Sequence, residues 1–88
     1  MTATDIKVLV VDDEPAIRRL LRVGLSTEGY AIREAATGRE AIERIAEALP
    51  DLVILDLGLP DLSGQELLQK WRAEALVLPI VILSSRTD

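Results

Sequence analysis

Cysteine, histidine and phenylalanine are absent from this 88-residue chain, and tryptophan and tyrosine occur once each. Without cysteine the chain has no disulfide framework and no thiolate metal site. Without histidine, zinc-type chemistry and Ser-His-Asp catalysis are excluded as well. Any metal must therefore be held by oxygen atoms, which favours Mg²⁺ or Ca²⁺.

Long apolar runs and basic clusters are also scarce. The apolar runs are too short to cross a membrane and the N-terminus is short and polar, so we expect no signal peptide, no membrane span and a cytoplasmic location. The net charge is −5, and Arg18, Arg19 and Arg22 fall within one predicted helix, where a solvated face is expected. Direct nucleic-acid binding by this segment is therefore not expected.

The residues that are present are mainly aliphatic, enough for the core of one small domain over residues 1–88. Short aliphatic runs predict three strands, Lys7–Val11, Leu52–Leu55 and Pro79–Leu83, and Tyr30–Ala35 is predicted as a fourth, weaker strand. Apolar residues at helical spacing predict three helices between them. The first helix begins at Pro15 and carries Ile17, Leu20, Leu21 and Leu25 on one face. Capping boxes open the second helix, at Thr37 and Glu40, and the third, at Ser63 and Glu66. The second helix is expected to stop at Pro50 and to carry on one face Ala41, Ile42, Ile45, Ala46 and Leu49.

Alternation of strands and helices predicts the α/β class, with a parallel sheet covered by helices on both faces. In such sheets ligands bind beyond the carboxyl ends of the strands. Three places meet that description: Asp12 and Asp13 after the first strand, Asp56 after the third, and Ser84 after the fourth.

The chemistry of these strand ends follows from their charge. A single aspartate here is usually a helix cap, but a doublet plus a third carboxylate on the adjacent strand would repel unless a cation neutralised them. Mg²⁺ suits a few carboxylates combined with phosphate oxygens. Asp56 is then the natural nucleophile toward a phosphate donor, and Asp12 and Asp13 the natural metal ligands. The Gly58 carbonyl would complete the coordination, and the Ser84 hydroxyl would donate to a phosphoryl oxygen.

Three segments resemble the signature segments of response-regulator receiver domains of bacterial two-component systems. They are Val10–Pro15, Leu55–Asp61 and Val81–Arg86. The second is especially similar to OmpR/PhoB-type transcriptional regulators, including the potassium-transport (Kdp) regulators. The resemblance runs over essentially the whole chain.

The resemblance implies a flavodoxin-like sheet with strand order 2-1-3-4 and a phospho-acceptor at Asp56. It also implies Mg²⁺ held by Asp12, Asp13, Asp56 and the Gly58 carbonyl, with Ser84 as the switch hydroxyl. The phosphoryl donor would be a sensor histidine kinase, and the full-length protein would control transcription. A receiver assists its own phosphorylation, so no enzyme with a turnover substrate is expected.

One departure from the family lies at the C-terminus. Receivers continue through a fourth helix, a fifth strand ending in a lysine, and a fifth helix, and residues 1–88 contain none of these. Lys7 and Lys70 are the only lysines and cannot take that role. We therefore expect a receiver that is incomplete at the C-terminus and slow to react. Its fourth strand would lie at the sheet edge and favour a homodimer through that strand.

Two alternatives compete with this interpretation. A phosphatase or phosphotransferase of the haloacid-dehalogenase type also places an aspartate nucleophile at a parallel strand end. Such sites want an Asp-x-Asp pair, whereas Asp12 and Asp13 are adjacent. The other alternative is an interaction module that is never phosphorylated, which would not bind Mg²⁺.

Overall fold

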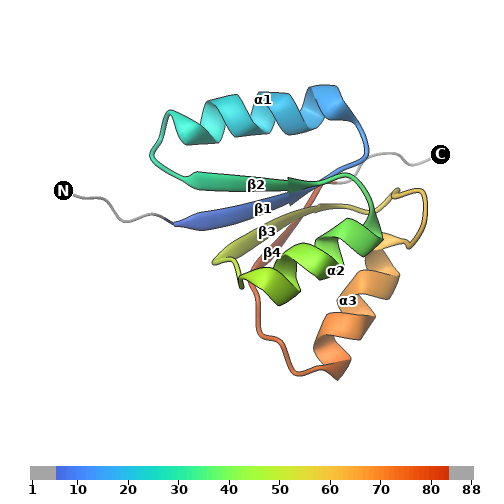
Figure 1. Ribbon diagram of the computed structural model, residues 1–88. Helices are drawn as coiled ribbons and strands as arrows, with labels where there is room; N and C mark the ends of the chain where they lie inside the picture. The colour runs from blue at the N-terminus through green and yellow to red at the C-terminus, as the bar shows by residue number, and fades with distance from the viewer. Residues whose placement is uncertain (1–5, 84–88) are drawn as a thin grey trace.

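The structure, a computed structural model, describes residues 6–83. Within these residues strands and helices alternate along the chain, as the sequence predicts. In chain order the elements are β1 (Lys7–Val11), α1 (Pro15–Ser26), β2 (Ala31–Ala35), α2 (Gly38–Glu47), β3 (Leu52–Asp56), α3 (Gly64–Ala73) and β4 (Ile80–Leu83). The sheet lies between α1 on one face and α2 and α3 on the other, as Figure 1 shows.

The sheet is parallel throughout and has the order β2-β1-β3-β4, which confirms the predicted topology. In the centre, Val11 of β1 pairs with Ala35 of β2 and with Leu55 of β3. Because these strands run in the same direction, the residues that end them lie at one edge of the sheet. This register is what brings distant parts of the sequence to one place.

The core lies on both faces of the two central strands. Side chains of a strand point alternately to opposite faces, so each strand contributes to two clusters. Leu9, Val11, Val53 and Leu55 belong to the cluster that includes Leu67 and Trp71 of α3. Val8, Val10 and Ile54 belong to the second cluster, with Leu21 and Leu25 of α1 packed against it. Burial on both faces explains why β1 and β3 are almost continuously apolar in sequence.

The two predicted helix caps are formed, with one difference in detail. At α3, the Ser63 hydroxyl accepts from the Glu66 N–H and the Glu66 carboxylate accepts from the Ser63 N–H, a complete capping box. At α2, the Thr37 hydroxyl accepts from the Glu40 N–H at 3.0 Å. The Glu40 carboxylate, however, accepts from Ala36 one residue earlier, so the predicted reciprocal bond is displaced.

The end of α2 lies earlier than predicted. The helix ends at Glu47 rather than at Pro50. Ala48 already has an extended backbone, with φ −159° and ψ 125°. Proline disfavours helical backbone in the residue before it, and here the chain leaves the helix one residue sooner than that effect requires. As a result Leu49, predicted to lie on the apolar face, is 54% exposed.

The first helix, α1, is only partly buried. Leu20, which the spacing places on the apolar face, is 67% exposed, and no residue of α1 is fully buried. Leu21 and Leu25 make the contact with the sheet. Among residues 6–83, none of the helices combines the length and the apolar character needed to cross a membrane.

The arginines of α1 do not form a uniformly solvated face, so that expectation was wrong for Arg18. Its side chain is 18% exposed and its Nε lies 3.2 Å from Glu34 on β2. Arg22 binds the other oxygen of Glu34 at 2.6 Å, while Arg19 is exposed. The bonds to these two guanidinium groups hold the pKa of Glu34 below its usual range. Arg18 and Arg22 therefore connect α1 to β2.

Candidate functional site

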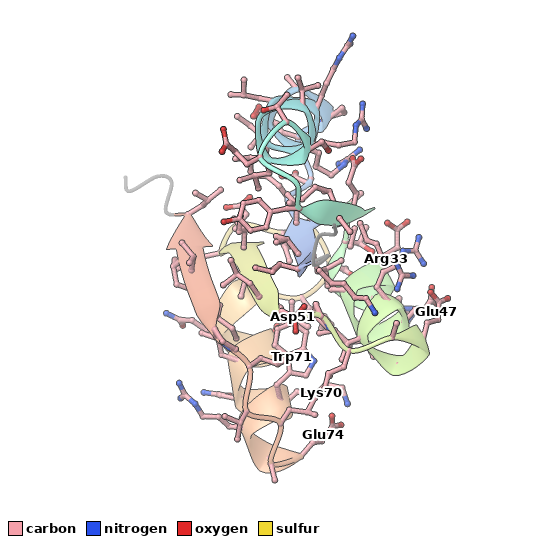
Figure 2. All side chains as sticks on the ribbon, turned by 90° about the vertical axis from the view of Figure 1, so that its left-hand side faces the viewer. Arg33, Glu47, Asp51, Lys70, Trp71 and Glu74 are labelled. Carbon is pink, nitrogen blue, oxygen red and sulfur yellow. The ribbon has the colours of Figure 1, made fainter. Side chains whose placement is uncertain are left out.

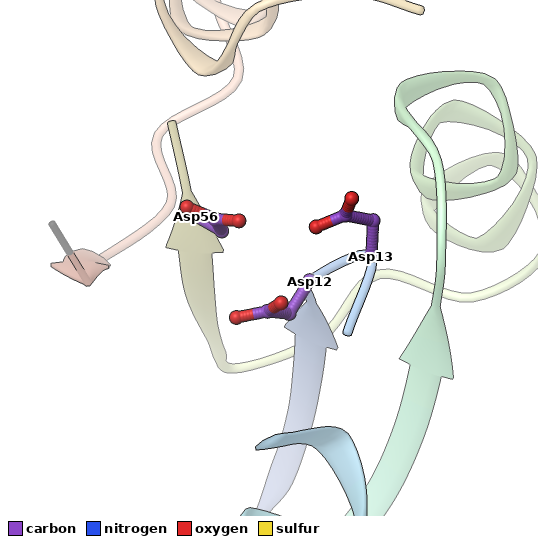
Figure 3. A group of neighbouring side chains, drawn as sticks. All are labelled: Asp12, Asp13 and Asp56. Carbon is purple, nitrogen blue, oxygen red and sulfur yellow. The ribbon is translucent and has the colours of Figure 1, made fainter. Parts of the chain in front are cut away.

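Three carboxylates meet at the carboxyl edge of the sheet. Asp12 follows β1, Asp56 is the last residue of β3, and the pairing of Val11 with Leu55 puts these two strand ends side by side. Asp13 comes from the start of the β1–α1 connection. Oxygen atoms of the three side chains lie within 4.8 Å of one another. Figure 3 shows the three side chains turned toward a common space, so the predicted juxtaposition of Asp12, Asp13 and Asp56 is confirmed as geometry.

Two of the three carboxylates are largely buried. Asp12 is 6% exposed and Asp56 is 9% exposed, whereas Asp13 is exposed to solvent. Backbone N–H groups bind the two buried ones: Glu14 donates to Asp12 Oδ1 at 2.9 Å, and Gly58 donates to Asp56 Oδ1 at 3.1 Å. Each buried carboxylate is thus oriented by the residue two positions after it. The site combines a protected interior with an open side at Asp13.

The backbone of Asp12 is held from two further directions. Its N–H donates to the carbonyl of Ala35 at the end of β2. Its carbonyl accepts from Arg18 Nη1 at 2.7 Å. This role of Arg18, which lies one helical turn into α1, was not predicted from the sequence. Its only signal there is weak: an arginine five residues after the acidic pair Asp12-Asp13.

Burial and mutual repulsion make the cluster electrostatically unfavourable. Burial raises the pKa of Asp12 above its ordinary value, and the charges of Asp56 and Asp13 act in the same direction. The bond from the Glu14 N–H favours the ionised form and offsets part of this effect. A divalent cation would relieve the repulsion. A donor set made only of carboxylate oxygens fits a hard ion such as Mg²⁺.

The positions of the other predicted site residues and of the two lysines complete the description of the site. Gly58 lies beside Asp56, to which its N–H is bonded, and it is exposed. Ser84 lies outside the described residues. Lys7 begins β1, at the end of the strand opposite to Asp12. Lys70 of α3 binds Glu74 at 2.6 Å, and both residues are labelled in Figure 2. Neither lysine of the chain therefore lies at the carboxylate cluster.

A parallel sheet of this order with acidic strand ends at its carboxyl edge defines a class: flavodoxin-like receiver folds. The family model "Response regulator receiver domain" matches residues 8–88. The chain belongs to the response-regulator receiver family of two-component signalling.

Curated relatives include OmpR/PhoB-type transcriptional regulators. The transcriptional regulatory protein KdpE of Mycobacterium tuberculosis is 52% identical over 81 residues, which are 92% of this chain and 35% of that protein. The virulence transcriptional regulatory protein PhoP of Salmonella typhimurium is 41% identical over 80 residues, covering 91% of this chain and 36% of that protein. The chain thus spans about a third of the length of these relatives.

Solved structures show the same fold. The response regulator TrrA of Thermotoga maritima, crystallised in complex with Mg²⁺-BeF, matches with a TM-score of 0.85 and 41% identity over 92% of this chain and 70% of that one. The chemotaxis response regulator CheY4 of Vibrio cholerae matches with a TM-score of 0.89 and 34% identity over 97% and 72%. These matches confirm the predicted fold class. The family match also goes against the haloacid-dehalogenase alternative.

The raised pKa of Asp12 gives a testable consequence for stability. An acid whose pKa is higher in the folded state destabilises that state once it ionises, so the penalty is absent at low pH and grows as pH rises through the unfolded and then the folded pKa. In metal-free buffer at pH 7, Asp12→Asn should therefore raise the melting temperature, by about 4–8 °C for each kcal/mol of penalty that it removes in a domain of this size. The gain should shrink at pH 3.

Thermal unfolding followed by circular dichroism measures this difference. Glu43→Gln is a matched control, because it removes the same charge from an exposed position on α2. It should change the melting temperature little at either pH. A melting temperature of Asp12→Asn below that of the unsubstituted chain at pH 7 would show that the carboxylate is not under repulsion.

Proposed function

We propose that this chain is a phospho-acceptor module in which Asp56 takes a phosphoryl group from a histidine kinase in the presence of Mg²⁺. The observation that carries the proposal is the cluster itself. A largely buried carboxylate at the end of a central strand stands next to two more at the end of the adjacent strand. An acidic cluster of this kind is poorly suited to structural capping, because every added charge costs stability unless a ligand binds.

Asp12, Asp13 and Asp56 would hold the ion, with the carbonyl of Gly58 as a further ligand. When bound, Mg²⁺ would supply positive charge that offsets the charge of these carboxylates and of the phosphoryl oxygens. The adjacent acidic side chains make this neutralisation necessary, because a phosphoryl group brings further negative charge to the same edge. The side chain of Asp13, which is exposed, gives the ion and the donor a route to the cluster.

The transfer itself uses Asp56 as nucleophile. One carboxylate oxygen attacks the phosphorus of the kinase phosphohistidine, a P–O bond forms, and the P–N bond breaks with its electron pair returning to the imidazole. The Gly58 N–H, 3.1 Å from Asp56 Oδ1, keeps the carboxylate oriented at the strand end. The Ser84 hydroxyl is proposed as a donor to the phosphoryl group. With no lysine at the cluster to bind that group, the reaction should be slow.

The wider role follows from the relatives. Because KdpE and PhoP are named as transcriptional regulators, we infer that this receiver controls transcription within a longer protein. The sensor kinase would be its partner, and both would meet in the cytoplasm. We expect no direct contact with nucleic acid from this segment, whose net charge is −5. One phosphoryl group per chain, without turnover, is the expected stoichiometry.

Phosphorylation should be confined to one residue. Incubation of the chain with acetyl phosphate and Mg²⁺ should add one phosphoryl group, and Asp56→Asn should abolish the adduct because it removes the nucleophilic oxygen. Intact-mass spectrometry measures both. Asp51→Asn, at the opposite end of β3, is the matched control and should be phosphorylated as the unsubstituted chain is.

The same experiment separates the alternatives. An unchanged adduct in Asp56→Asn would overturn the assignment of the acceptor. Continuous release of phosphate from an ester substrate would support a phosphatase instead. A chain that forms no adduct with Mg²⁺ present, and does not bind the ion, would be an interaction module.

We also propose that the 88-residue chain forms a homodimer through β4. Among the described residues β4 pairs only with β3, so its other edge presents unpaired backbone groups. Val81 and Ile82 are 49% and 40% exposed on opposite faces. An open groove also runs between α3 and β4, and all but one of its lining residues are apolar: Leu68, Trp71, Arg72, Leu76, Leu78, Ile80 and Ile82. Covering a few hundred Å² of this surface offers several kcal/mol at ~25 cal/mol per Å², which can offset the cost of association.

Sedimentation velocity at micromolar concentration tests this arrangement. The unsubstituted chain should sediment as a dimer or larger species. Val81→Lys should shift it toward monomer, because a charge on the edge strand opposes edge-to-edge pairing. Val77→Lys is the control, since Val77 is 93% exposed in the connection before β4. A stable, folded monomer of the unsubstituted chain would contradict the proposal.

A further inference from the structure

The connection from β3 to α3 is bound to the start of α2 by one carboxylate. Asp61 Oδ1 accepts from the N–H of Gly38 at 2.8 Å, and Oδ2 accepts from the N–H of Arg39 at 3.0 Å. These are the first two residues of α2, whose N–H groups have no acceptor within the helix. Asp61 Oδ1 also accepts from the N–H of Leu62 at 2.8 Å. A residue more than twenty positions later in the chain therefore completes the cap of α2.

Close packing accompanies these hydrogen bonds. A Cβ atom on Gly38 would lie 2.7 Å from Cβ of Leu62 and 3.1 Å from its Cδ1, distances that leave no room for a side chain. The connection is also closed at its far end, where a Cβ on Gly64 would lie 2.8 Å from the Cα of Leu57. Leu59, which lies between Leu57 and Leu62 in this connection, is 9% exposed and belongs to the core. Glycine at position 38 is thus what lets the connection approach α2 this closely.

The electrostatics agree with a bound carboxylate. The hydrogen bond from Gly38 lowers the pKa of Asp61 most, and those from Arg39 and Leu62 act in the same direction. The positive end of the α2 dipole favours a negative charge at this place. Asp61 is therefore ionised at neutral pH while it bridges the two segments.

Asp61 lies close in sequence to the carboxylate cluster. Gly58, whose N–H binds Asp56 Oδ1, lies three residues before Asp61. Pro60 between them has a fixed φ, so this short segment has fewer ways to absorb a displacement at Asp61 before it reaches Gly58. Leu57 is fixed on the other side by the bond from the Gly64 N–H to its carbonyl. The position of Gly58 is consequently set by contacts at both ends of a short segment.

We propose that Asp61 is a positioning residue of the phospho-acceptor site: by binding the start of α2, it holds the segment that carries Gly58 beside Asp56. The inference rests on the proposed function, because its readout is ligand binding at the carboxylate cluster. Asp61 should therefore affect the binding of Mg²⁺ and of beryllofluoride, used as a phosphoryl analogue, and not only the stability of α2.

Four variants of the 88-residue chain test this. Asp61→Ala removes all three hydrogen bonds, and Asp61→Asn keeps one side-chain oxygen. Gly38→Ala keeps the Asp61 carboxylate but crowds the connection, because the added Cβ would lie 2.7 Å from Cβ of Leu62 and 3.2 Å from Oδ1 of Asp61. Thr37→Ala is the control, because it removes another cap of the same helix, the bond to the Glu40 N–H, without touching the β3–α3 connection. Each variant is first melted by circular dichroism, and binding is measured at a temperature where all are folded.

Calorimetric titration with Mg²⁺, alone and with beryllofluoride, gives the dissociation constants. We expect Asp61→Ala and Gly38→Ala to weaken binding by about tenfold, the lower end of what lost support around metal ligands costs. Asp61→Asn should fall between these and the unsubstituted chain. Thr37→Ala should lower the melting temperature but leave the dissociation constants within about twofold.

The outcomes are distinguishable. If the unsubstituted chain binds neither Mg²⁺ nor beryllofluoride, the proposed function itself fails. If it binds both, and Asp61→Ala and Thr37→Ala lose melting temperature alike without a change in binding, Asp61 is only a helix cap and the inference is overturned. Should Asp61→Ala not fold, Gly38→Ala and Asp61→Asn decide: unchanged binding in both would overturn the inference equally.

Discussion

The pairing of β1 with β3 is the constraint on which the site depends. It fixes the ends of two strands that are more than forty residues apart: β3 ends in Asp56, and Asp12 directly follows the last residue of β1. The hydrophobic cores on the two faces of the sheet hold that register, because a slip by one residue would move every side chain of the slipped strand from one core to the other. Apolar packing therefore compels three carboxylates to share a small volume, against their mutual repulsion.

Much of the remaining local structure supports this arrangement. The N–H groups of Glu14 and Gly58 orient the two buried carboxylates, and Arg18 holds the carbonyl of Asp12 from α1. Such contacts restrict the carboxylates without neutralising them. A cation is the one partner that would do so, and the carboxylate oxygens are suitable ligands for Mg²⁺. The charge repulsion at the strand ends thus lowers the stability of the fold, as is common at binding sites.

The elements and the acidic edge could be predicted from sequence because each has a local signal. Mainly apolar runs of four to five residues marked β1, β3 and β4, and the Ser63–Glu66 pair marked the start of α3. Asp12, Asp13 and Asp56 followed from the rule that strand ends of a parallel sheet share one edge. What failed was also local: the spacing rule placed Leu20 and Leu49 on apolar faces, but how far a face is covered depends on neighbours that spacing does not specify. Contacts between distant segments had no such signal, so Arg18 was taken for a solvated residue and the bridge from Asp61 to α2 was not foreseen.

Whether the three carboxylates act as one cation site can be tested directly. A ligand that binds only the folded chain must raise its melting temperature as its concentration increases. Mg²⁺ should raise the melting temperature of the unsubstituted chain progressively. Asp13→Ala removes the exposed member of the cluster and leaves the core untouched, and it should abolish the rise. An equal rise in Asp13→Ala would place the ion elsewhere and show that the three carboxylates are not its site.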